Sequence, residues 1–451
     1  MGAPEHGRLP SHPLSRALSR RSFLGVTLAA SGTAALALAG CGAGGGAGGA
    51  AKDLTYWSFD EGRVAIARHV VESAAFKQLH PDVRVDFQQF TWAQMHDKLL
   101  AALVSGRGAP DMADIEIQRF PQFIGGNSVP FLDLTGRIGA SVDELARSAA
   151  VDPWSWQGKI YGVGTELNAV TLTYRDDVMR SLGIKTPFAT WDDVIAAGKT
   201  VSASGTMKMF GVHDLAVFDW DMITQVMGGT FFDKSGAFAG DSEQGVQALT
   251  WLRDLVHAHG IADIAPADAN NIYNGPQYWA AFQANRYAAI FGPAWLFTGL
   301  LKNVPDQAGK WRMQNLPTGL GASLPTAFAG GTGQAVTAQS RNVDACWDIV
   351  RLTNFSLDSS RFEYDQRGVL PTYKPALAQP WLQEPTAYYG GQNIGAVYSK
   401  IADQIPPWNT SPQLYKGVDA IVRLAITPVL NNRADPASAL RQVRDELNRL
   451  K

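Results

Sequence analysis

The chain contains few cysteines and few charged residues for its length. Only 2 of its 451 residues are cysteine and 18% are charged, against a usual charged share of about 25%. Two cysteines exclude a disulfide-rich scaffold. The formal charge of −2 and the scattered basic residues argue against a nucleic-acid partner, which would need a basic stripe. With 46% hydrophobic residues, we expect a globular chain of two or three lobes, at roughly 100–200 residues per domain.

The first 40 residues have the pattern of an export signal. Arginines precede residues 22–40, which carry no charge. Residues 19–25, S-R-R-S-F-L-G, match the twin-arginine consensus, and residues 38–41, L-A-G-C, match the lipobox of bacterial lipoproteins. We therefore expect residues 1–40 to be a signal peptide, and lipidation of Cys41 to anchor the protein at the extracytoplasmic face of the cell membrane. A retained signal anchor is the alternative, although its many small residues would make a weak membrane span.

Residues 41–52 are expected to form the lipidated cysteine and a tether. Only glycine and alanine occupy residues 42–51, which is typical of a flexible linker. A phosphate-binding loop is the alternative, but no strand precedes these glycines and no Gly-Lys-Ser/Thr follows them. Lipidation of Cys41 leaves Cys346 alone. Because Cys346 lies in a helical pattern, we expect a buried apolar residue rather than a reactive thiol.

From residue 53 onward, strand and helix patterns alternate. The first strands are predicted at 54–57, 83–87 and 110–115, with helices over 64–80 and 92–106 between them. This series predicts a mainly parallel sheet, whose ligands bind at the carboxyl ends of the strands. Further elements are expected as follows: strands at 159–163, 170–174 and 287–291, a turn at 292–295, helices at 251–259 and 278–285, a helix capped by Thr190 with Asp193, and a closing helix at 436–451.

Four stretches, in this order along the chain, resemble a known family. They are 76–85 with 105–111, 162–193, 289–295, and 328–336 with 368–372. Together they are similar to the extracellular solute-binding proteins of sugar transporters, the maltose-binding-protein group. The resemblance implies a periplasmic-binding-protein-like α/β fold, in which two lobes are joined by crossover strands and the ligand lies in a cleft between them.

The same resemblance implies the division into lobes and the partners. Lobe 1 is expected from 53–163 with 327–357, and lobe 2 from 164–326 with 358–451, with crossings near 162–166 and 326–329. A protein of this family captures a carbohydrate and delivers it to the transmembrane subunits of an ABC permease with its cytoplasmic ATPase. We expect a monomer without catalytic activity, cofactor or metal. Residues 388–393 and 405–408 look most like members that handle lactose or arabinose-containing oligosaccharides.

Two other functions stay open at this point. One is the binding of another polar solute, such as a glycerophosphodiester, which would favour clustered basic residues. The other is a lipid-anchored glycoside hydrolase, which needs two carboxylates about 5–10 Å apart. Glu363 with Asp365, or Asp60 with Glu61, could supply such a pair, but neither comes with a catalytic motif.

The candidate ligand-binding residues follow from the chemistry of sugars. Sugar C–H patches stack on aromatic rings, and sugar hydroxyls pair with carboxylates, amides and guanidinium groups. Trp295 follows a predicted strand where the family often places a ring in the cleft; a core tryptophan is the alternative. Glu166 lies eight residues before Tyr174, where relatives carry an acidic residue that accepts sugar hydroxyls; a surface salt bridge is the alternative.

The remaining candidates have equally plausible structural roles. Asp60 and Glu61 lie in the first strand-to-helix loop, where helix capping is the alternative. Gly330 and Gly331 suit either close approach to a ligand or a lobe crossing. Packing or solvation competes with ligand binding for a further set: Asp114 or Glu116, Trp220, Arg367, Tyr389 and Trp408.

Overall fold

The computed structural model describes residues 52–126, 128–267 and 272–449. The expected signal peptide, the lipidated Cys41 and the tether through residue 51 lie outside the described residues. Residue 52, which we had assigned to the tether, is the first residue of a strand. Across the described ranges, no helix has both the length and the apolar character needed to cross a membrane.

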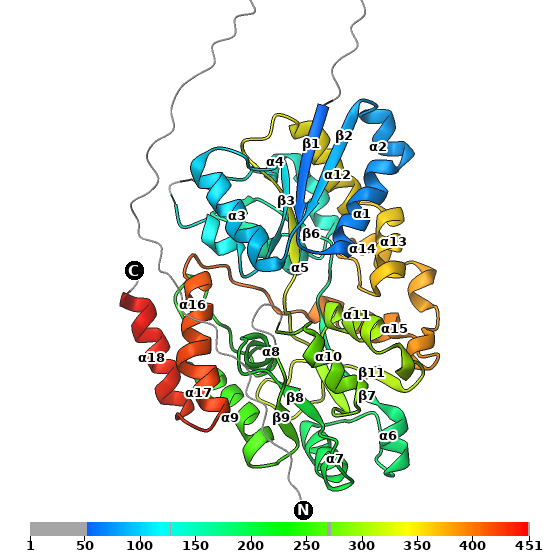
Figure 1. The fold of residues 1–451 in the computed structure, drawn as a ribbon, viewed down its shortest axis with the longest axis vertical. Helices are drawn as coiled ribbons and strands as arrows, with labels where there is room; N and C mark the ends of the chain where they lie inside the picture. The colour runs from blue at the N-terminus through cyan, green and yellow to red at the C-terminus, as the bar shows by residue number, and fades with distance from the viewer. Residues whose placement is uncertain (1–51, 127, 268–271, 450–451) are drawn as a thin grey trace, which may run out of the picture. The chain divides into compact units, whose positions relative to one another are not determined.

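A five-stranded sheet occupies the upper half of Figure 1. Strand β1 pairs in parallel with both β2 and β3, which confirms the predicted β-α-β series. Strand β12 then pairs antiparallel with both β3 and β6. In sheet order the strands are β2 (Val83–Gln89), β1 (Lys52–Ser58), β3 (Met112–Glu116), β12 (Thr332–Val336) and β6 (Val163–Gly164).

The helix predicted over 64–80 is broken into two. Helix α1 (Glu61–Glu72) and helix α2 (Ala74–Leu79) are separated by Ser73. Ser73 has extended backbone angles, and its hydroxyl accepts a hydrogen bond from the Phe76 amide, so it caps α2. Helix α3 (Trp92–Ser105) ends as predicted at Gly106, which takes a left-handed conformation with φ of 69°.

The lower half of Figure 1 holds a second set of strands, arranged in smaller sheets. Strand β7 (Val170–Arg175) is the centre of an antiparallel sheet between β10 (Ala289–Pro293) and β11 (Trp311–Gln314). Strands β8 (Phe210–Val212) and β9 (Ala262–Ile264) pair in parallel beside it. The helices of this part of the chain are α6 (Asp176–Ser181), α7 (Trp191–Ala203), α8 (Phe218–Val226), α9 (Glu243–His257), α10 (Pro276–Gln283) and α11 (Ala294–Asn303).

Two local predictions in this region had opposite outcomes. The capping box of α7 is confirmed, because the Thr190 hydroxyl accepts from the Asp193 amide and the Asp193 carboxylate accepts from the Thr190 amide. The turn predicted at 292–295 is wrong. Strand β10 continues to Pro293 and helix α11 begins at once with Ala294. Pro293, at the N-cap, fits this abrupt change because amide groups at the start of a helix have no acceptor within the helix, so its missing N–H loses no helical hydrogen bond.

The strand predicted at 159–163 is also divided. Strand β4 (Ser155–Trp156) forms a hairpin with β5 (Lys159–Ile160), and β6 follows only after Tyr161 and Gly162. A β-carbon on Gly162 would lie 3.2 Å from the Trp154 side chain. The backbone therefore passes close to a buried tryptophan, and this packing separates the two short strands.

The C-terminal part of the chain is mostly helical. Helix α12 (Val343–Asn354) buries Cys346 completely, and burial raises the pKa of its thiol to about 12, which confirms the expected buried cysteine. The closing helix, α18 (Pro436–Arg449), is also confirmed through residue 449. The other helices are α13 (Leu357–Arg367), α14 (Lys374–Leu377), α15 (Ile394–Ser399), α16 (Leu414–Ile421) and α17 (Thr427–Leu430), and short helices α4 (Thr135–Ile138) and α5 (Arg147–Ala150) lie earlier in the chain.

Three segments connect the two sets of strands. Residues 165–169 lead from β6 to β7, and residues 326–331 return to β12; both lie near the predicted crossings. A third segment, 368–373, runs beside the first. Leu167 donates to the Leu370 carbonyl and Thr372 donates to the Thr165 carbonyl, each at 2.8 Å. The fold therefore consists of two α/β lobes joined by three hydrogen-bonded segments.

Candidate functional site

Six charged side chains are buried together where the chain crosses between the lobes. We call them the crossing cluster. Asp60 has 35% of its side chain exposed, and none of the other five exceeds 8%. The cluster draws on helix α1, strand β3, the first crossing segment and helix α13, and its members are Asp60, Arg63, Asp114, Glu166, Glu363 and Arg367.

Arg63 links helix α1 to the first crossing segment. Asp60 caps α1 by accepting from the Arg63 amide at 3.1 Å, which fixes the start of the helix. The Arg63 Nη1 atom donates to Thr165 Oγ1 at 3.1 Å and lies 3.4 Å from Glu166 Oε1. Its Nε atom lies 3.0 Å from Asp114 Oδ1, although not in line for a hydrogen bond.

Arg367, the last residue of α13, completes the cluster. Its Nη1 atom donates to both Glu166 Oε1 and Glu363 Oε1, the latter at 3.0 Å. Its Nη2 atom lies 3.5 Å from Asp60 Oδ2. The backbone carbonyl of Arg367 also accepts a hydrogen bond from the Thr298 hydroxyl of α11. One residue therefore joins α1, the first crossing segment, α13 and α11.

The four carboxylates of the cluster do not share the same proton affinity. Burial raises the pKa of Glu363 to about 7; Arg367 opposes this shift, while the nearby Glu166 adds to it. Burial acts in the same direction on Glu166, but the guanidinium groups of Arg367 and Arg63 outweigh it and lower the pKa of Glu166. Glu363 therefore keeps its proton to a higher pH than Glu166 does.

Removal of Arg63 should destabilise the fold strongly. We expect Arg63→Met to lower the free energy of unfolding by about 3–5 kcal/mol, because it leaves buried carboxylates without their cation. Arg84→Met is the matched control. Arg84 pairs with Asp53 at a site where the two side chains are 74% and 70% exposed, so we expect a change within about 0.5 kcal/mol. Urea denaturation of both variants measures the difference, and equal costs would contradict the role of the cluster.

Four of the candidate ligand residues, Asp60, Asp114, Glu166 and Arg367, are therefore members of one ionic network. The capping role of Asp60 is confirmed. The alternative for Glu166, a surface salt bridge, is wrong, because its ion pairs are buried and its second oxygen accepts from Asn168 at 3.2 Å. Whether Asp60, Glu166 or Arg367 contacts a ligand stays a prediction.

Sequence reasoning did not identify the cluster as a unit. It missed Arg63, and it named Glu363 only as half of a hydrolase pair. One signal was available, since Glu363 and Arg367 are four residues apart and so lie on one face of a helix. The partners in the crossing segment lie about 200 residues away in sequence, and no local pattern indicates them.

Trp295 lies at the start of α11, beside the return crossing. Its indole Nε1 donates to the Ala329 carbonyl at 3.0 Å, and the ring is only partly buried. Tyr273 meets it edge-on with ring centroids 5.9 Å apart, and Phe218 lies at 6.2 Å. The indole is therefore held at one edge while part of its surface stays accessible, as a stacking platform requires.

The glycines of the return crossing allow this close approach. Gly330 has φ of 74°, and a β-carbon there would lie 2.6 Å from Trp295 Nε1. Gly331 has φ of 130°, and its β-carbon would meet Asn168 at 3.3 Å. Both positions require glycine for the passage of the backbone between side chains. The lobe-crossing role is thus supported by the packing, and close approach to a ligand stays a prediction.

The side chain of Gln225 holds Phe328, another residue of the return crossing. Gln225 of α8 accepts from the Phe328 amide and donates to the Phe328 carbonyl, both at 2.9 Å. Its amide also donates to Asp221 Oδ2 at 2.8 Å. Burial raises the pKa of Asp221 to about 8. Both backbone polar groups of Phe328 are thus hydrogen-bonded to the Gln225 side chain. The next residue, Ala329, supplies the carbonyl that accepts from Trp295.

Glu116 stands at the end of β3, in the other lobe. Burial raises its pKa to about 8, and its Oε2 atom accepts from the Gln118 amide at 2.9 Å. The amide of Glu116 donates to His96 Nε2 at 3.1 Å, while His96 Nδ1 lies 2.7 Å from the Trp92 carbonyl. These contacts assign the proton of neutral His96 to Nδ1. A protonated Glu116 could both donate to and accept from a hydroxyl group.

Glu116 should make the stability of the fold depend on pH. Its folded pKa of about 8 lies above the usual value of about 4.3, so the folded state keeps a proton that the unfolded state has lost. We therefore expect the wild type to lose stability relative to Glu116→Gln as pH rises from about 5 to 8, by at most about 1.4 kcal/mol per pH unit. Urea denaturation at pH 5, 6.5 and 8 measures this slope.

Glu72→Gln provides the control for this experiment, because Glu72 lies exposed at the end of α1. We expect it to leave the pH dependence of unfolding as it is in the wild type. The same slope in wild type and Glu116→Gln would mean that Glu116 is ionised in the folded protein.

A second arginine connects the lobes at another place. Arg119, after β3, has its guanidinium 4.2 Å from the Trp92 ring centroid and 5.0 Å from that of Tyr415 on α16. It donates to the Tyr415 hydroxyl at 3.1 Å and forms an ion pair with Asp97 at 3.2 Å. Arg119 was absent from the predicted site, because neither its sequence neighbours nor its spacing indicates a partner on α16.

Three aromatic candidates are buried in the protein interior. Trp220 is fully buried, stacks on Phe231 and donates from its indole to the Gly245 carbonyl at 2.7 Å, so the packing alternative describes its environment and a ligand contact stays a prediction. Tyr389 is 1% and Trp408 is 9% exposed. For both, the packing alternative describes the observed environment, and a ligand contact stays a prediction.

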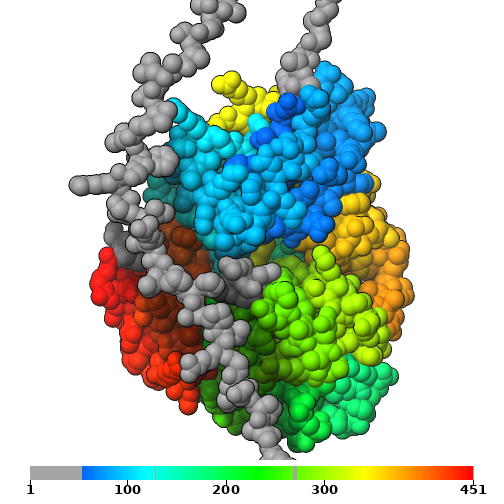
Figure 2. Space-filling view, in the orientation of Figure 1, coloured from blue at the N-terminus to red at the C-terminus, as the bar shows by residue number. Residues whose placement is uncertain are grey.

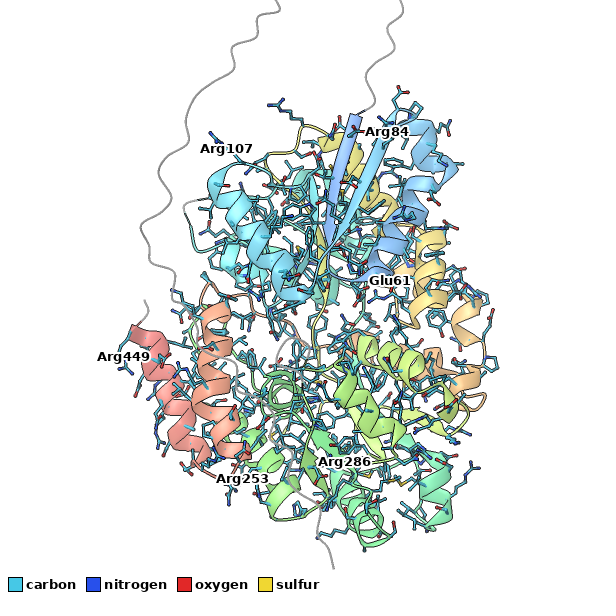
Figure 3. All side chains as sticks on the ribbon, in the orientation of Figure 1. Glu61, Arg84, Arg107, Arg253, Arg286 and Arg449 are labelled. Carbon is cyan, nitrogen blue, oxygen red and sulfur yellow. The ribbon has the colours of Figure 1, made fainter. Side chains whose placement is uncertain are left out.

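Glu61 points outward from the cluster. It lies in the first turn of α1, at the end of this helix that faces α11 (Figure 3). Its carboxylate is 3.7 Å from Lys302 Nζ of α11, and the two side chains are 81% and 74% exposed. The contact is therefore a solvent-exposed ion pair between helices of different lobes.

Neither of the two carboxylate pairs considered for a hydrolase has the environment that the acid and base of a glycoside hydrolase need. Asp60 caps a helix and Glu61 is exposed. Glu363 is buried while Asp365 is 45% exposed and forms an ion pair with Arg361. Among the residues that the structure describes, no group of three or more histidine, cysteine, aspartate or glutamate side chains could hold a metal ion.

The fold and the site define a two-lobed α/β binding protein. The family model of the bacterial extracellular solute-binding proteins matches residues 63–352. The chain therefore belongs to this family.

Curated relatives extend the match over most of the chain. An arabinooligosaccharide-binding protein of Halalkalibacterium halodurans is 29% identical over 368 residues, which are 80% of this chain and 81% of the relative. An arabinooligosaccharide-binding protein of Bacillus subtilis is 27% identical over 405 residues, 88% of this chain and 92% of the relative. A lactose-binding protein of Rhizobium radiobacter is 25% identical and covers 80% of this chain and 84% of its own.

Solved structures have the same fold. The GacH receptor of Streptomyces glaucescens superposes with a TM-score of 0.72 at 19% identity, covering 88% of this chain and 98% of its own. A binding protein of Bifidobacterium animalis subsp. lactis, solved with β-1,6-galactobiose, has a TM-score of 0.71 at 19% identity, covering 88% and 96%. These similarities confirm the expected periplasmic-binding-protein-like fold.

Proposed function

We propose that the protein is the extracytoplasmic binding component of an ABC importer for a sugar or short oligosaccharide. It captures the carbohydrate and delivers it to the transmembrane subunits of a permease. Support comes from the family and from relatives named for arabinooligosaccharides and lactose. The role is binding without catalysis, and the protein acts as a monomer.

One observation favours a sugar over other solutes. Trp295 is anchored through its indole nitrogen to the Ala329 carbonyl, while its ring remains partly accessible beside Tyr273 and Phe218. Such a ring offers a fixed surface for sugar C–H groups. Glu116, protonated near neutral pH, would supply a polar group from the other lobe.

The anchoring and the lobe boundaries belong to the same proposal. Lipidation of Cys41 would hold the protein at the outer face of the cell membrane. Lobe 1 would comprise 53–163 with 327–357, and lobe 2 would comprise 164–326 with 358–451. Helix α13 packs against α1 and α12, which favours moving the last boundary to the third crossing segment, after Arg367. In Figure 2, the golden surface, which includes α13, adjoins the blue surface that includes α1 and α2.

A glycerophosphodiester is the weaker alternative. A phosphate group would need basic side chains able to turn toward it. The buried arginines Arg63, Arg119 and Arg367 each already pair with a carboxylate of the protein. A neutral ligand is compatible with this arrangement, and a charged one would have to compete with existing ion pairs.

Calorimetry of the purified protein against mono-, di- and oligosaccharides tests the proposal, with lactose and arabinose oligomers in the panel. With the bound sugar identified, we expect Trp295→Ala to weaken affinity about three- to tenfold, because stacking contributes about 0.5–1.5 kcal/mol. Trp295→Phe should retain part of this affinity, since a ring remains. Trp156→Ala is the control, because Trp156 lies on the separate β4–β5 hairpin.

The outcomes separate the class of protein from the role of one residue. Absence of binding across the whole panel, together with hydrolysis of a member, would replace the importer by the hydrolase. Binding that changes less than about threefold in Trp295→Ala would leave the importer in place and remove the stacking role of Trp295.

A further inference from the structure

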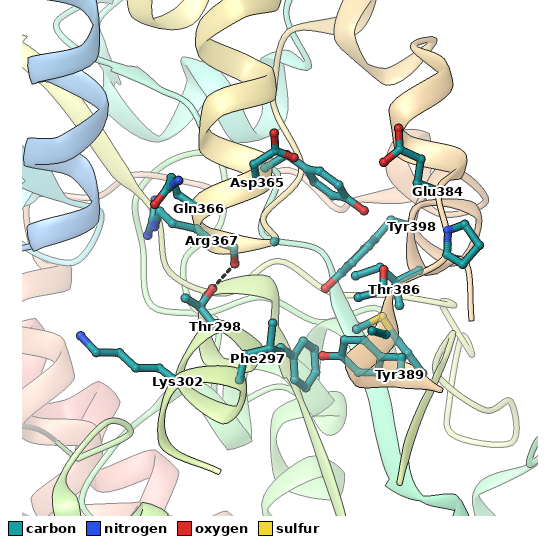
Figure 4. A pocket seen from close by; sticks show the side chains of 17 residues that line it. Phe297, Thr298, Lys302, Asp365, Gln366, Arg367, Glu384, Thr386, Tyr389 and Tyr398 are labelled. Atoms are coloured by element: carbon teal, nitrogen blue, oxygen red, sulfur yellow. Dashed lines mark hydrogen bonds between the residues drawn. The ribbon is translucent and has the colours of Figure 1, made fainter. Parts of the chain in front are cut away.

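A cavity lies beside the crossing cluster, and its lining includes Arg367 but not Trp295. Its volume is about 530 Å³, within the range of about 300–1,000 Å³ that is usual for small-molecule sites. Helix α11, the end of α13, and residues 384–398 enclose it, as Figure 4 shows. The hydrogen bond from Thr298 to the Arg367 carbonyl forms part of its wall.

The charged groups of this cavity are already matched within the protein. Lys302 faces Glu61 at 3.7 Å, and Arg367 belongs to the crossing cluster. Asp365 and Glu384 both pair with Arg361, at 2.7 and 3.4 Å. An ionic ligand would therefore have to displace existing partners, whereas an uncharged ligand would not.

The rest of the lining suits a polyhydroxylated molecule. The lining includes both aromatic rings and hydroxyl or amide groups: Phe297, Tyr364, Tyr389, Tyr398, Thr298, Gln366 and Thr386. The Tyr389 hydroxyl is buried and has no hydrogen-bond partner among the described residues. It lies toward Phe297 of α11 in Figure 4. A buried hydroxyl without a partner is costly, and a ligand hydroxyl would satisfy it once the side chains that cover it move aside.

We propose that this cavity is a second saccharide site, which takes a neutral mono- or disaccharide unit in contact with α11, α13 and Tyr389. The proposal rests on the proposed function, because it assumes that the protein binds sugars. It goes beyond that function, since Trp295 is not among the residues that line this cavity.

Two substitutions test the site without removing the crossing cluster. Ala387→Trp introduces a large ring from an exposed lining residue, and it should occupy the cavity. Tyr389→Phe removes only the hydroxyl and should weaken binding there about three- to tenfold. The thermal midpoint of ligand-free Tyr389→Phe should equal or exceed that of the wild type, because the substitution removes an unpaired buried group.

The measurement is the number of sugar equivalents bound at saturation, obtained by calorimetry and equilibrium dialysis with L-arabinose and lactose. We expect two equivalents for the wild type and one for Ala387→Trp, whereas Trp295→Ala should keep two equivalents, one of them bound about three- to tenfold more weakly. Ala140→Trp is the control, because Ala140 is an exposed residue outside the lining, and it should keep both equivalents.

Each result has a distinct meaning. A single equivalent in the wild type, weakened by Trp295→Ala and left unchanged by both Ala387→Trp and Tyr389→Phe, would overturn the second site while the importer role stands. Absence of sugar binding in the wild type would overturn the proposed function and the second site together.

Discussion

The contact of two arginines with four carboxylates at the crossing is the constraint on which the rest of the structure depends. Arg63 and Arg367 hold helix α1, strand β3, the first crossing segment and α13 in one buried network. Buried charges carry a large desolvation cost and are tolerated only with their partners in place. The network therefore fixes how the first crossing segment and α13 lie against α1 and β3.

The two aromatic environments show how the same residue type serves different ends. Trp220 is fully enclosed and donates to a backbone carbonyl in its own lobe. Trp295 donates to a carbonyl of the crossing segment and keeps part of its ring accessible. In both cases the indole N–H has a hydrogen-bond partner. The two rings differ in burial, because Trp220 is fully enclosed and Trp295 is not. Exposure of the ring, rather than its presence, decides whether a tryptophan can meet a ligand.

The local parts of the fold could be predicted from the sequence. The β-α-β order, the capping box of Thr190 and the glycine end of α3 each depend on residues close together in the chain. The crossing cluster could not, because its members meet only after the whole chain has folded. The break at Ser73 was missed for a related reason: its serine cap competes with an apolar pattern that continues across it. Burial of Trp220 and Tyr389 likewise depends on the tertiary packing around them.

The amide of Gln225 has a further consequence for the return crossing. A backbone that leaves a sheet normally exposes its N–H and C=O groups, and a buried one must find substitutes. Gln225 presents the same pair of groups as a peptide bond, and it meets the Phe328 peptide groups as a neighbouring strand would. The Gln225 side chain of α8 thus makes the two hydrogen bonds that a neighbouring strand would otherwise make. The irregular return crossing can therefore run through the interior with the polar groups of Phe328 paired within the protein. The neighbouring Ala329 carbonyl is kept in a fixed direction, toward Trp295.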